Sequence, residues 1–441
     1  MKTKLFRTLC ALAAGGLIAT ATPPADAADY IWTNTAASGS FTNSVLWNPG
    51  GGTDASPTGT TDNVIFTNGA AYTVFLSNSA AFYSSSVFFT NNVSGISMSV
   101  TQWIDAAKPW TVLNQYYVGA AVTAGKTNQS VIASGILAVT NAAHNAQLIV
   151  GNGFGSGAGV GQLVLNSGTI LADQLLVTNN VGGAGGFTNS LFAFNGGTLV
   201  TSNQYLAADI VIASNNNFNI NGVWNMLGGT NLIRSTSVGF NAGTVFVGNG
   251  VSNAAVNVNA GAIWSLGTNT PGTGVTNLNL TIGTGAATGD TVNINGGVLT
   301  NVGTVIIGNS AGSVSNGLVI TDGGTFASGA LTVGNAAGAS NNYYNVGGGV
   351  AAVTVSNNGL ITVGASGASF NTMTVTNANL WSIGLAVGSA SGGGTNVVTV
   401  LTNSVWNLLV GNVTVNTTSK DRKSTRLNSS HSSVSRMPSS A

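Results

Sequence analysis

The sequence predicts an all-β protein, a right-handed parallel β-helix (β-solenoid) with irregular N-terminal coils. Two observations predict this fold. Short β-branched segments alternate with Gly and Asn, residues that are typical of turns, and the 441 residues include 62 Gly. Similar short patterns also return after about 25 residues, a period that is typical of repeat architectures.

The first repeated pattern is a mostly apolar triplet closed by Gly. Its copies are Leu148–Gly151, Val245–Gly248, Leu280–Gly283, Val305–Gly308, Leu331–Gly334, Ile361–Gly364, Leu385–Gly388 and Leu408–Gly411. A second pattern lies between them, an alternating strand that runs into small residues, as in Val292–Gly297. Because the units vary in length around a constant pattern, we expect parallel coils with variable loops. A meander of hairpins would instead show two-residue turns between strands of similar register.

The low charge of the chain supports stacked coils. Only 5% of residues are charged, whereas an ordinary domain has about 25%. Like charges stacked about 4.8 Å apart would repel each other, while Asn, Thr and Val ladders stack favourably. Residues 28–419 hold three basic side chains and eight aspartates, a net charge of −5. This balance lacks the basic patch of a nucleic-acid-binding protein, so we expect no nucleic-acid partner.

The N-terminus has the pattern of an export signal. Basic residues within 2–7 precede the apolar segment Leu9–Ala21, and Ala25–Ala27 offers small residues for cleavage. We therefore expect residues 1–27 to be a signal peptide and the protein to be extracellular or on the outer-membrane surface. Cys10 is the only Cys and lies within this segment, so the mature chain would have no disulfide.

Two further segments follow the signal peptide. Residues 28–147 are rich in aromatic strands, and we expect them to form the first coils and to cover the open end of the solenoid. Residues 148–419 are expected to form the regular repeats. The first segment contains Trp32, Trp47, Trp103 and Trp110.

The last residues depart from the pattern of the chain. Asp421–His431 reads DRKSTRLNSSH and resembles the translation of a common short-read sequencing adapter, and Ser435–Ala441 resembles its continuation. We therefore expect residues 420–441 to be a non-native tail on a truncated gene. The alternative is a basic, disordered interaction tail.

The beginning of the mature chain resembles a known family. Ile31–Thr33, Leu46–Pro49, Asp62–Phe66 and Tyr72–Val74 are similar to the start of bacterial autotransporter-associated β-strand repeat proteins. The resemblance implies a secreted or surface-exposed β-helical passenger, with outer-membrane attachment through a C-terminal domain that would be missing here. It brings no catalytic residues to this sequence.

Candidate catalytic groups are few and scattered. A catalytic triad or a zinc site at His144 would need partners, but the mature chain before the tail has no Cys and no second His. We interpret His144 as a residue of a surface loop. Glycoside hydrolysis needs paired carboxylates, whereas the eight Asp are spread along the chain. We predict no catalytic residue, no cofactor and no metal site.

A speculative ligand surface comprises three Trp and two Asp. The Trp residues follow the second pattern of three units, where they are either core aromatics or a strip for stacking sugars. The Asp residues lie in neighbouring units and are either solvated turn residues or, if they share one face, a site for calcium or sugar. The five residues are Trp264, Trp381, Trp406, Asp290 and Asp322.

Three functions are compatible with these features. We expect a non-catalytic structural or adhesive protein that contacts extracellular polysaccharide or other cell surfaces. The alternatives are a carbohydrate-active β-helix, such as a polysaccharide lyase or hydrolase, and a polysaccharide-binding module. A lyase would need a cation, for which only Arg234, Lys108 and Lys126 are available. Clustering of Arg234 with two Asp in a groove would favour an enzyme, and dispersal would favour a rod.

Overall fold

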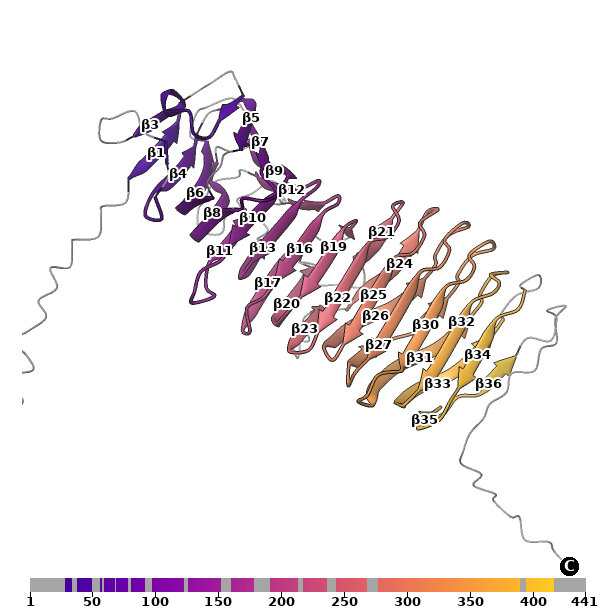
Figure 1. The fold of residues 1–441 in the computed structure, drawn as a ribbon. Helices are drawn as coiled ribbons and strands as arrows, with labels where there is room; N and C mark the ends of the chain where they lie inside the picture. The colour runs from indigo at the N-terminus through magenta and orange to yellow at the C-terminus, as the bar shows by residue number, and fades with distance from the viewer. Residues whose placement is uncertain are drawn as a thin grey trace, which may run out of the picture.

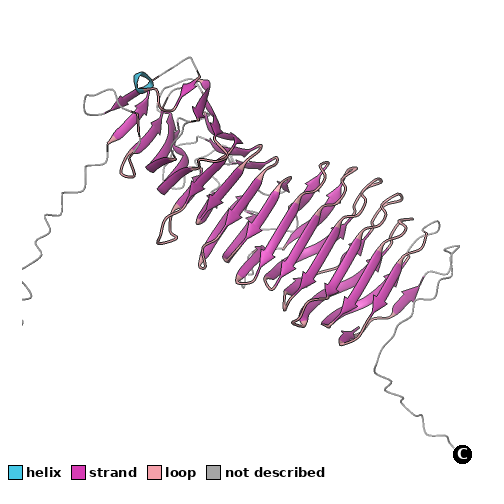
Figure 2. Cartoon of the chain, viewed as in Figure 1, coloured by secondary structure: helices cyan, strands magenta, loops and turns pink. Residues whose placement is uncertain are grey.

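The computed structural model describes residues 28–415 with gaps at 34–37, 50–55, 58, 68, 78–80, 92–96, 123–125, 152–159, 178–190, 213–216, 236–242, 268–276 and 389–393. The expected signal peptide and the expected non-native tail lie outside the described residues. The described chain is an elongated stack of strands (Figure 1). Among the described residues the only helix is the short 3-10 helix η1 (Ser44–Leu46), coloured cyan in Figure 2. The prediction of an all-β parallel β-solenoid is therefore confirmed, while the right-handed winding stays a prediction.

Each regular coil contributes a strand to three parallel ladders. The first ladder begins at β1, whose outer edge pairs in the antiparallel sense with β3 (Trp47–Pro49). Every later neighbour along this ladder is parallel. Its members are β1 (Asp29–Trp32), β4 (Asn63–Phe66), β6 (Phe82–Asn91), β8 (Trp110–Val122), β11 (Gln147–Val150), β14 (Gln174–Val177), β17 (Leu206–Ile212), β20 (Gly229–Ser235), β23 (Ala262–Leu266), β26 (Val298–Ile307), β28 (Thr325–Ser328), β31 (Val353–Val363), β33 (Ala378–Val387) and β35 (Ser404–Asn407).

The second ladder starts from the first halves of β6 and β8 and is also parallel. It continues through β10 (Ile136–Val139), β13 (Thr169–Ala172), β16 (Thr198–Thr201), β19 (Val223–Met226), β22 (Ala255–Asn259), β25 (Thr291–Asn295), β27 (Gly317–Thr321), β30 (Tyr343–Gly347), β32 (Thr372–Thr376) and β34 (Val397–Val400).

The third ladder is parallel as well and includes the second halves of β26, β31 and β33, which bend from one ladder into the next. Its other members are β2 (Gly39–Ser40), β5 (Ala71–Leu76), β7 (Met98–Ile104), β9 (Thr127–Ser134), β12 (Val160–Leu165), β15 (Leu191–Phe194), β18 (Phe218–Ile220), β21 (Thr244–Asn249), β24 (Leu278–Thr284), β29 (Leu331–Val333) and β36 (Val413–Val415).

One hydrophobic core runs along the inside of the stack. Buried and exposed side chains alternate in β5 and β7, as expected when successive side chains point to opposite faces of a strand. The inward side chains form a single cluster that extends from Trp32 to Val400. In the first coils this core is aromatic. Trp32 packs edge-on against Trp47, with ring centroids 4.9 Å apart, and stacks on Tyr72.

A row of carboxamides lines one corner of the later coils, and all but the last of them are buried. We call Asn316, Asn342, Asn371 and Asn396 the asparagine ladder. The backbone N–H and the side-chain Nδ2 of Asn316 both donate to Oδ1 of Asn342, at 3.0 Å each. Asn342 does the same to Asn371 at 3.1 Å, and Asn371 does so to Asn396 at 3.0 and 3.1 Å. Each Asn therefore links its own coil to the next one.

The asparagine ladder explains why several copies of the first repeated pattern end in Gly. Gly308 has a φ of +72°, and a Cβ there would overlap the side chain of Asn342. Gly283 and Gly334 stand in the same relation to Asn316 and Asn371. Gly is needed at these positions for two reasons: the left-handed backbone and the space that the buried carboxamide occupies.

Candidate functional site

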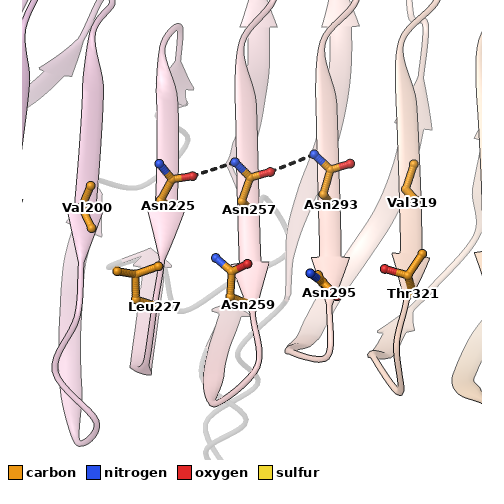
Figure 3. Close-up of a pocket in the computed structure, with 9 residues that line it drawn as sticks. All are labelled: Val200, Asn225, Leu227, Asn257, Asn259, Asn293, Asn295, Val319 and Thr321. Atoms are coloured by element: carbon orange, nitrogen blue, oxygen red, sulfur yellow. Dashed lines mark hydrogen bonds between the residues drawn. The ribbon is translucent and has the colours of Figure 1, made fainter. Parts of the chain in front are cut away.

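A shallow polar groove lies on the outer face of the second ladder, across β16, β19, β22, β25 and β27. Its volume is about 450 Å³, and none of its lining residues is charged. The residues that line it fall into two parallel rows, one through Val200, Asn225, Asn257, Asn293 and Val319 and one through Leu227, Asn259, Asn295 and Thr321 (Figure 3). We call it the asparagine groove, and its lining residues are Val200, Asn225, Leu227, Asn257, Asn259, Asn293, Asn295, Val319 and Thr321.

Three carboxamides along the groove are joined head to tail. Nδ2 of Asn257 donates to Oδ1 of Asn225 at 2.7 Å, and Nδ2 of Asn293 donates to Oδ1 of Asn257 at 2.8 Å. Parallel pairing holds them in register, since Asn225 is level with Asn257, which is level with Asn293. A carboxamide has two donor hydrogens and two acceptor lone pairs, so Asn257 keeps hydrogen-bonding capacity for a ligand after these two bonds.

A second polar groove, of about 540 Å³, lies on the first ladder near the N-terminal end. Its carboxamides also form a row: Nε2 of Gln115 donates to Gln147 at 3.4 Å, and Nε2 of Gln147 donates to Gln174 at 3.2 Å. We call it the glutamine groove, and its lining residues are Ser86, Asn114, Gln115, Asn145, Gln147 and Gln174.

His144 lies beside the glutamine groove and has a partner that sequence reasoning missed. Its Nδ1 is 3.2 Å from Oδ1 of Asp173, whose side chain is 1% exposed, while the imidazole is 66% exposed. Oδ2 of Asp173 accepts the backbone N–H of Asn141 at 3.0 Å. The carboxylate therefore fixes the turn that carries His144, which has a left-handed φ of 52°. The two residues are one coil apart, a relation that becomes visible only once the coil register is known.

Arg234 lies on the outer face of β20 and is held by one carboxylate. Its Nε and Nη2 donate to Oδ1 and Oδ2 of Asp209 on β17, at 2.7 and 2.5 Å. This bidentate contact with the Asp209 carboxylate raises the pKa of Arg234 above its usual range. Among the described residues, Asp209 is the only carboxylate within ion-pair distance of Arg234. The bidentate ion pair thus links the adjacent strands β17 and β20.

The three Trp of the speculative ligand surface do not share one face. Trp264 is fully buried and packs against Trp224 with ring centroids 6.3 Å apart. Trp406 also points inward, and its Nε1 donates to Ser382 Oγ at 3.0 Å. Trp381 alternates outward on β33 and is half-buried. A continuous sugar-stacking strip of these three side chains is therefore not formed, because strand alternation turns two of them into the core.

The two Asp of that surface are also apart. Asp290 immediately precedes β25 and is fully buried. Asp322 immediately follows β27, is exposed, and accepts the backbone N–H of Val350 at 2.9 Å. They occupy opposite ends of the second-ladder strands, so the structure does not bring them together as ligands for one ion.

The described residues offer neither a metal-binding cluster nor a membrane-spanning helix. No group of three or more His, Cys, Asp or Glu side chains there is arranged to hold a metal ion. Within the same residues, no helix has the length and apolar character needed to cross a membrane.

Comparisons with known proteins add no relative to this description. No family model matches the chain, and no curated protein or solved structure matches it either.

Proposed function

We propose that the protein is a secreted or cell-surface structural and adhesive rod without catalytic activity, similar to the passenger of an autotransporter. The observation that carries the proposal is the unbroken parallel pairing from β1 to β35 along the first ladder. Each added coil lengthens such a stack by about 4.8 Å, so the fold yields a spacer that can hold a contact surface away from its attachment point.

The placement of charged groups supports a rod over a polysaccharide lyase or hydrolase. Arg234 is engaged by the single carboxylate of Asp209, and Asp290 and Asp322 lie at opposite ends of their strands. A lyase needs a cation and a proton acceptor converging on one substrate group, and a hydrolase needs paired carboxylates. Asp290 and Asp322 instead each accept a backbone N–H, from Ala254 and Val350.

The test uses the chain expressed with its own N-terminus in a Gram-negative host. We expect the protein outside the cytoplasm, with a core of residues 28–415 that resists proteinase K, and beads coated with it should adhere to cells or polysaccharide under flow. Retention in the cytoplasm would contradict the proposal. So would new reducing ends or unsaturated products after incubation with a panel of polysaccharides.

A second candidate function, binding of a neutral polysaccharide chain, is favoured by the asparagine groove. Its rows of carboxamides repeat at the strand spacing of about 4.8 Å and offer donors and acceptors without charge. An extended chain of hydroxyl-bearing sugars that lies along the solenoid axis would meet equivalent groups on successive coils. Leu227, which is 53% exposed, adds an apolar contact for a sugar face.

The groove is tested by pull-down on insoluble neutral polysaccharides. The double variant Asn257→Ala/Asn293→Ala should bind at least tenfold more weakly than the unchanged chain, whereas Gln147→Ala in the glutamine groove serves as the matched control. Equal loss in both variants, or no binding by the unchanged chain, would remove this candidate. The rod proposal would stand in either case, because it does not depend on this groove.

A further inference from the structure

Asp290 occupies the position of an asparagine in the asparagine ladder, one coil before Asn316. Asn316 Oδ1 accepts the backbone N–H of Asp290 at 3.0 Å, as Asn342 Oδ1 does for Asn316. In turn, Asp290 Oδ1 accepts the backbone N–H of Ala254 at 2.8 Å. A Cβ at Gly248 would overlap the carboxyl group, as a Cβ at Gly283 would overlap Asn316. Asp290 is thus the first rung of the ladder.

The ladder requires a donor that an ionised carboxylate does not have. Nδ2 of Asn316 donates to Asn342 Oδ1 at 3.0 Å and to the carbonyl of Ala287 at 3.3 Å. The corresponding atom of Asp290 is Oδ2, which is buried and has no hydrogen-bond partner. By equivalence with Asn316, this oxygen faces acceptors, so a negative charge on it would be opposed by its surroundings.

Among the described residues, no opposite charge acts on this carboxyl group. Asp290 is the only Asp, Glu, Lys, Arg, His, Tyr or Cys between Arg234 and Asp322 in the sequence. The groups packed around it are uncharged: Gly248 in β21, Ala254 before β22 and Asn316 before β27. Asp322, in the next coil, lies exposed at the other end of β27. Burial is accordingly the main cause of a raised pKa for Asp290, about 6, and the bond from Ala254 opposes it.

We propose that Asp290 is a protonatable first rung of the asparagine ladder: as a neutral acid it donates through its Oδ2 hydrogen to Asn316 Oδ1, and its ionisation loosens the joint between these coils. The rod then carries a pH-sensitive joint at one defined level. No other described rung carries an ionisable group, since the remaining members of the ladder are Asn.

The direction of the pH effect follows from the raised pKa. The carboxyl group has a pKa of 3.8 when solvated and about 6 when folded, so folding favours the protonated form. The contact between these coils is strongest below about pH 4 and weakens as the pH rises from about 4 to about 6. Above about pH 6 its strength no longer changes with pH. A neutral isostere at this position should abolish the dependence.

The test compares the full chain with its Asp290→Asn variant by amide hydrogen exchange at pH 8 and at pH 4. At pH 8, we expect amides in the peptides covering 248–256 and 286–292 to exchange at least about tenfold more slowly in Asp290→Asn than in the unchanged chain. The largest difference that a pKa shift of about two units can give is about 100-fold. At pH 4 the two chains should agree. Asp322→Asn, which changes an exposed carboxyl group in the next coil, should leave these peptides unchanged at both pH values.

A direct titration keeps the proposal testable even if the variant folds poorly. In the unchanged chain labelled with carboxyl-¹³C aspartate, the signal that is absent from Asp290→Asn, or that titrates apart from the solvent-exposed aspartates, should have a midpoint near pH 6. If every aspartate signal titrates near pH 4, or if Asp290→Asn leaves exchange at pH 8 unchanged or faster, the proposal is wrong.

Discussion

The first coils and the later coils fill the same solenoid interior by different means. In the first coils, rings of different kinds interlock: Phe41 contacts Trp47, Phe82 and Trp110 with centroid distances of 5.1, 5.2 and 5.4 Å. In the later coils, a corner repeats one residue type, with Asn316, Asn342 and Asn371 linked by bonds of 3.0–3.1 Å. The aromatic region depends on buried area, and the carboxamide region depends on register.

The two kinds of packing differ in how much variation between coils they allow. The aromatic region contains the antiparallel pairing of β1 with β3 and register shifts between β6 and β8, and register also shifts in the later coils, as between β31 and β33. A carboxamide ladder needs the same corner geometry at every level. Residues with a left-handed φ accordingly stand before three of the rungs, at Ser315, Asn341 and Phe370. The corner that carries the ladder therefore repeats from coil to coil, whereas the ring contacts of the first coils differ from one coil to the next.

The largest expected effect is in the aromatic region. Phe41→Ala should lower the free energy of unfolding of the first coils by about 3–5 kcal/mol, because it leaves a cavity among three rings. Phe75→Ala is the matched control, since Phe75 on neighbouring β5 is 41% exposed. Urea titration followed by hydrogen exchange measures both. If the two variants differ by less than about 1 kcal/mol, the first coils do not depend on ring packing.

The second largest loss of stability is expected in the asparagine ladder. Asn342→Ala removes the acceptor for both the N–H and the Nδ2 of Asn316, and unsatisfied buried donors cost about 1–3 kcal/mol each. We expect a loss of about 2–4 kcal/mol, localised by hydrogen exchange to the coils on either side. Asn335→Ala is the control, because Asn335 is half-buried and makes a single bond of 2.9 Å to Asn309. Comparable losses in the two variants would argue against a special role for the buried row.

Glycine substitutions separate backbone strain from crowding. Gly308 and Gly250 have φ values of +72° and +71°, but a Cβ would meet the Asn342 carboxamide only at Gly308, and nothing lies within 4 Å at Gly250. Gly250→Ala should therefore cost the left-handed strain of about 1–2 kcal/mol, and Gly308→Ala should cost about 1–3 kcal/mol more through overpacking. Thermal unfolding of both variants measures the two stability losses and shows whether they differ. Equal costs would mean that Gly is required for its backbone alone.

The repeated patterns predicted coils but did not assign every strand to a ladder. Most copies of the first pattern lie on the third ladder, whereas Leu148–Gly151 lies on the first. Leu408–Gly411 forms a turn in which Leu409 has a φ of 41°, and the third-ladder strand at this level is Val413–Val415. An apolar triplet fits any inward-facing strand, and what distinguishes most third-ladder copies is the Asn or Asp side chain that faces their Gly. That partner is about a coil away and varies in sequence distance with loop length.

The candidate site was less accessible to sequence reasoning. Trp264 and Trp406 share the inward position of the first ladder with Leu299, Phe326 and Leu380, whereas Trp381 is one residue out of phase and points outward. A shift of one residue reverses the face of a strand, so composition could not distinguish a core Trp from a surface Trp. The asparagine groove was missed for a related reason, because Asn225, Asn257 and Asn293 become neighbours only through the register of three coils.

The smallest effect is expected on the outer face, where carboxamides also form a row. Asn257→Ala breaks bonds to Asn225 and Asn293, but these side chains are half-buried and water can replace the lost partners. We expect the free energy of unfolding to change by about 0.5 kcal/mol or less, as is usual for surface substitutions, against the larger loss for the buried Asn342→Ala. Denaturant titration of the two variants compares the rows directly. A loss near 2 kcal/mol for Asn257→Ala would mean that the outer row holds the coils together; a negligible loss leaves its exposed hydrogen-bonding groups available for a ligand.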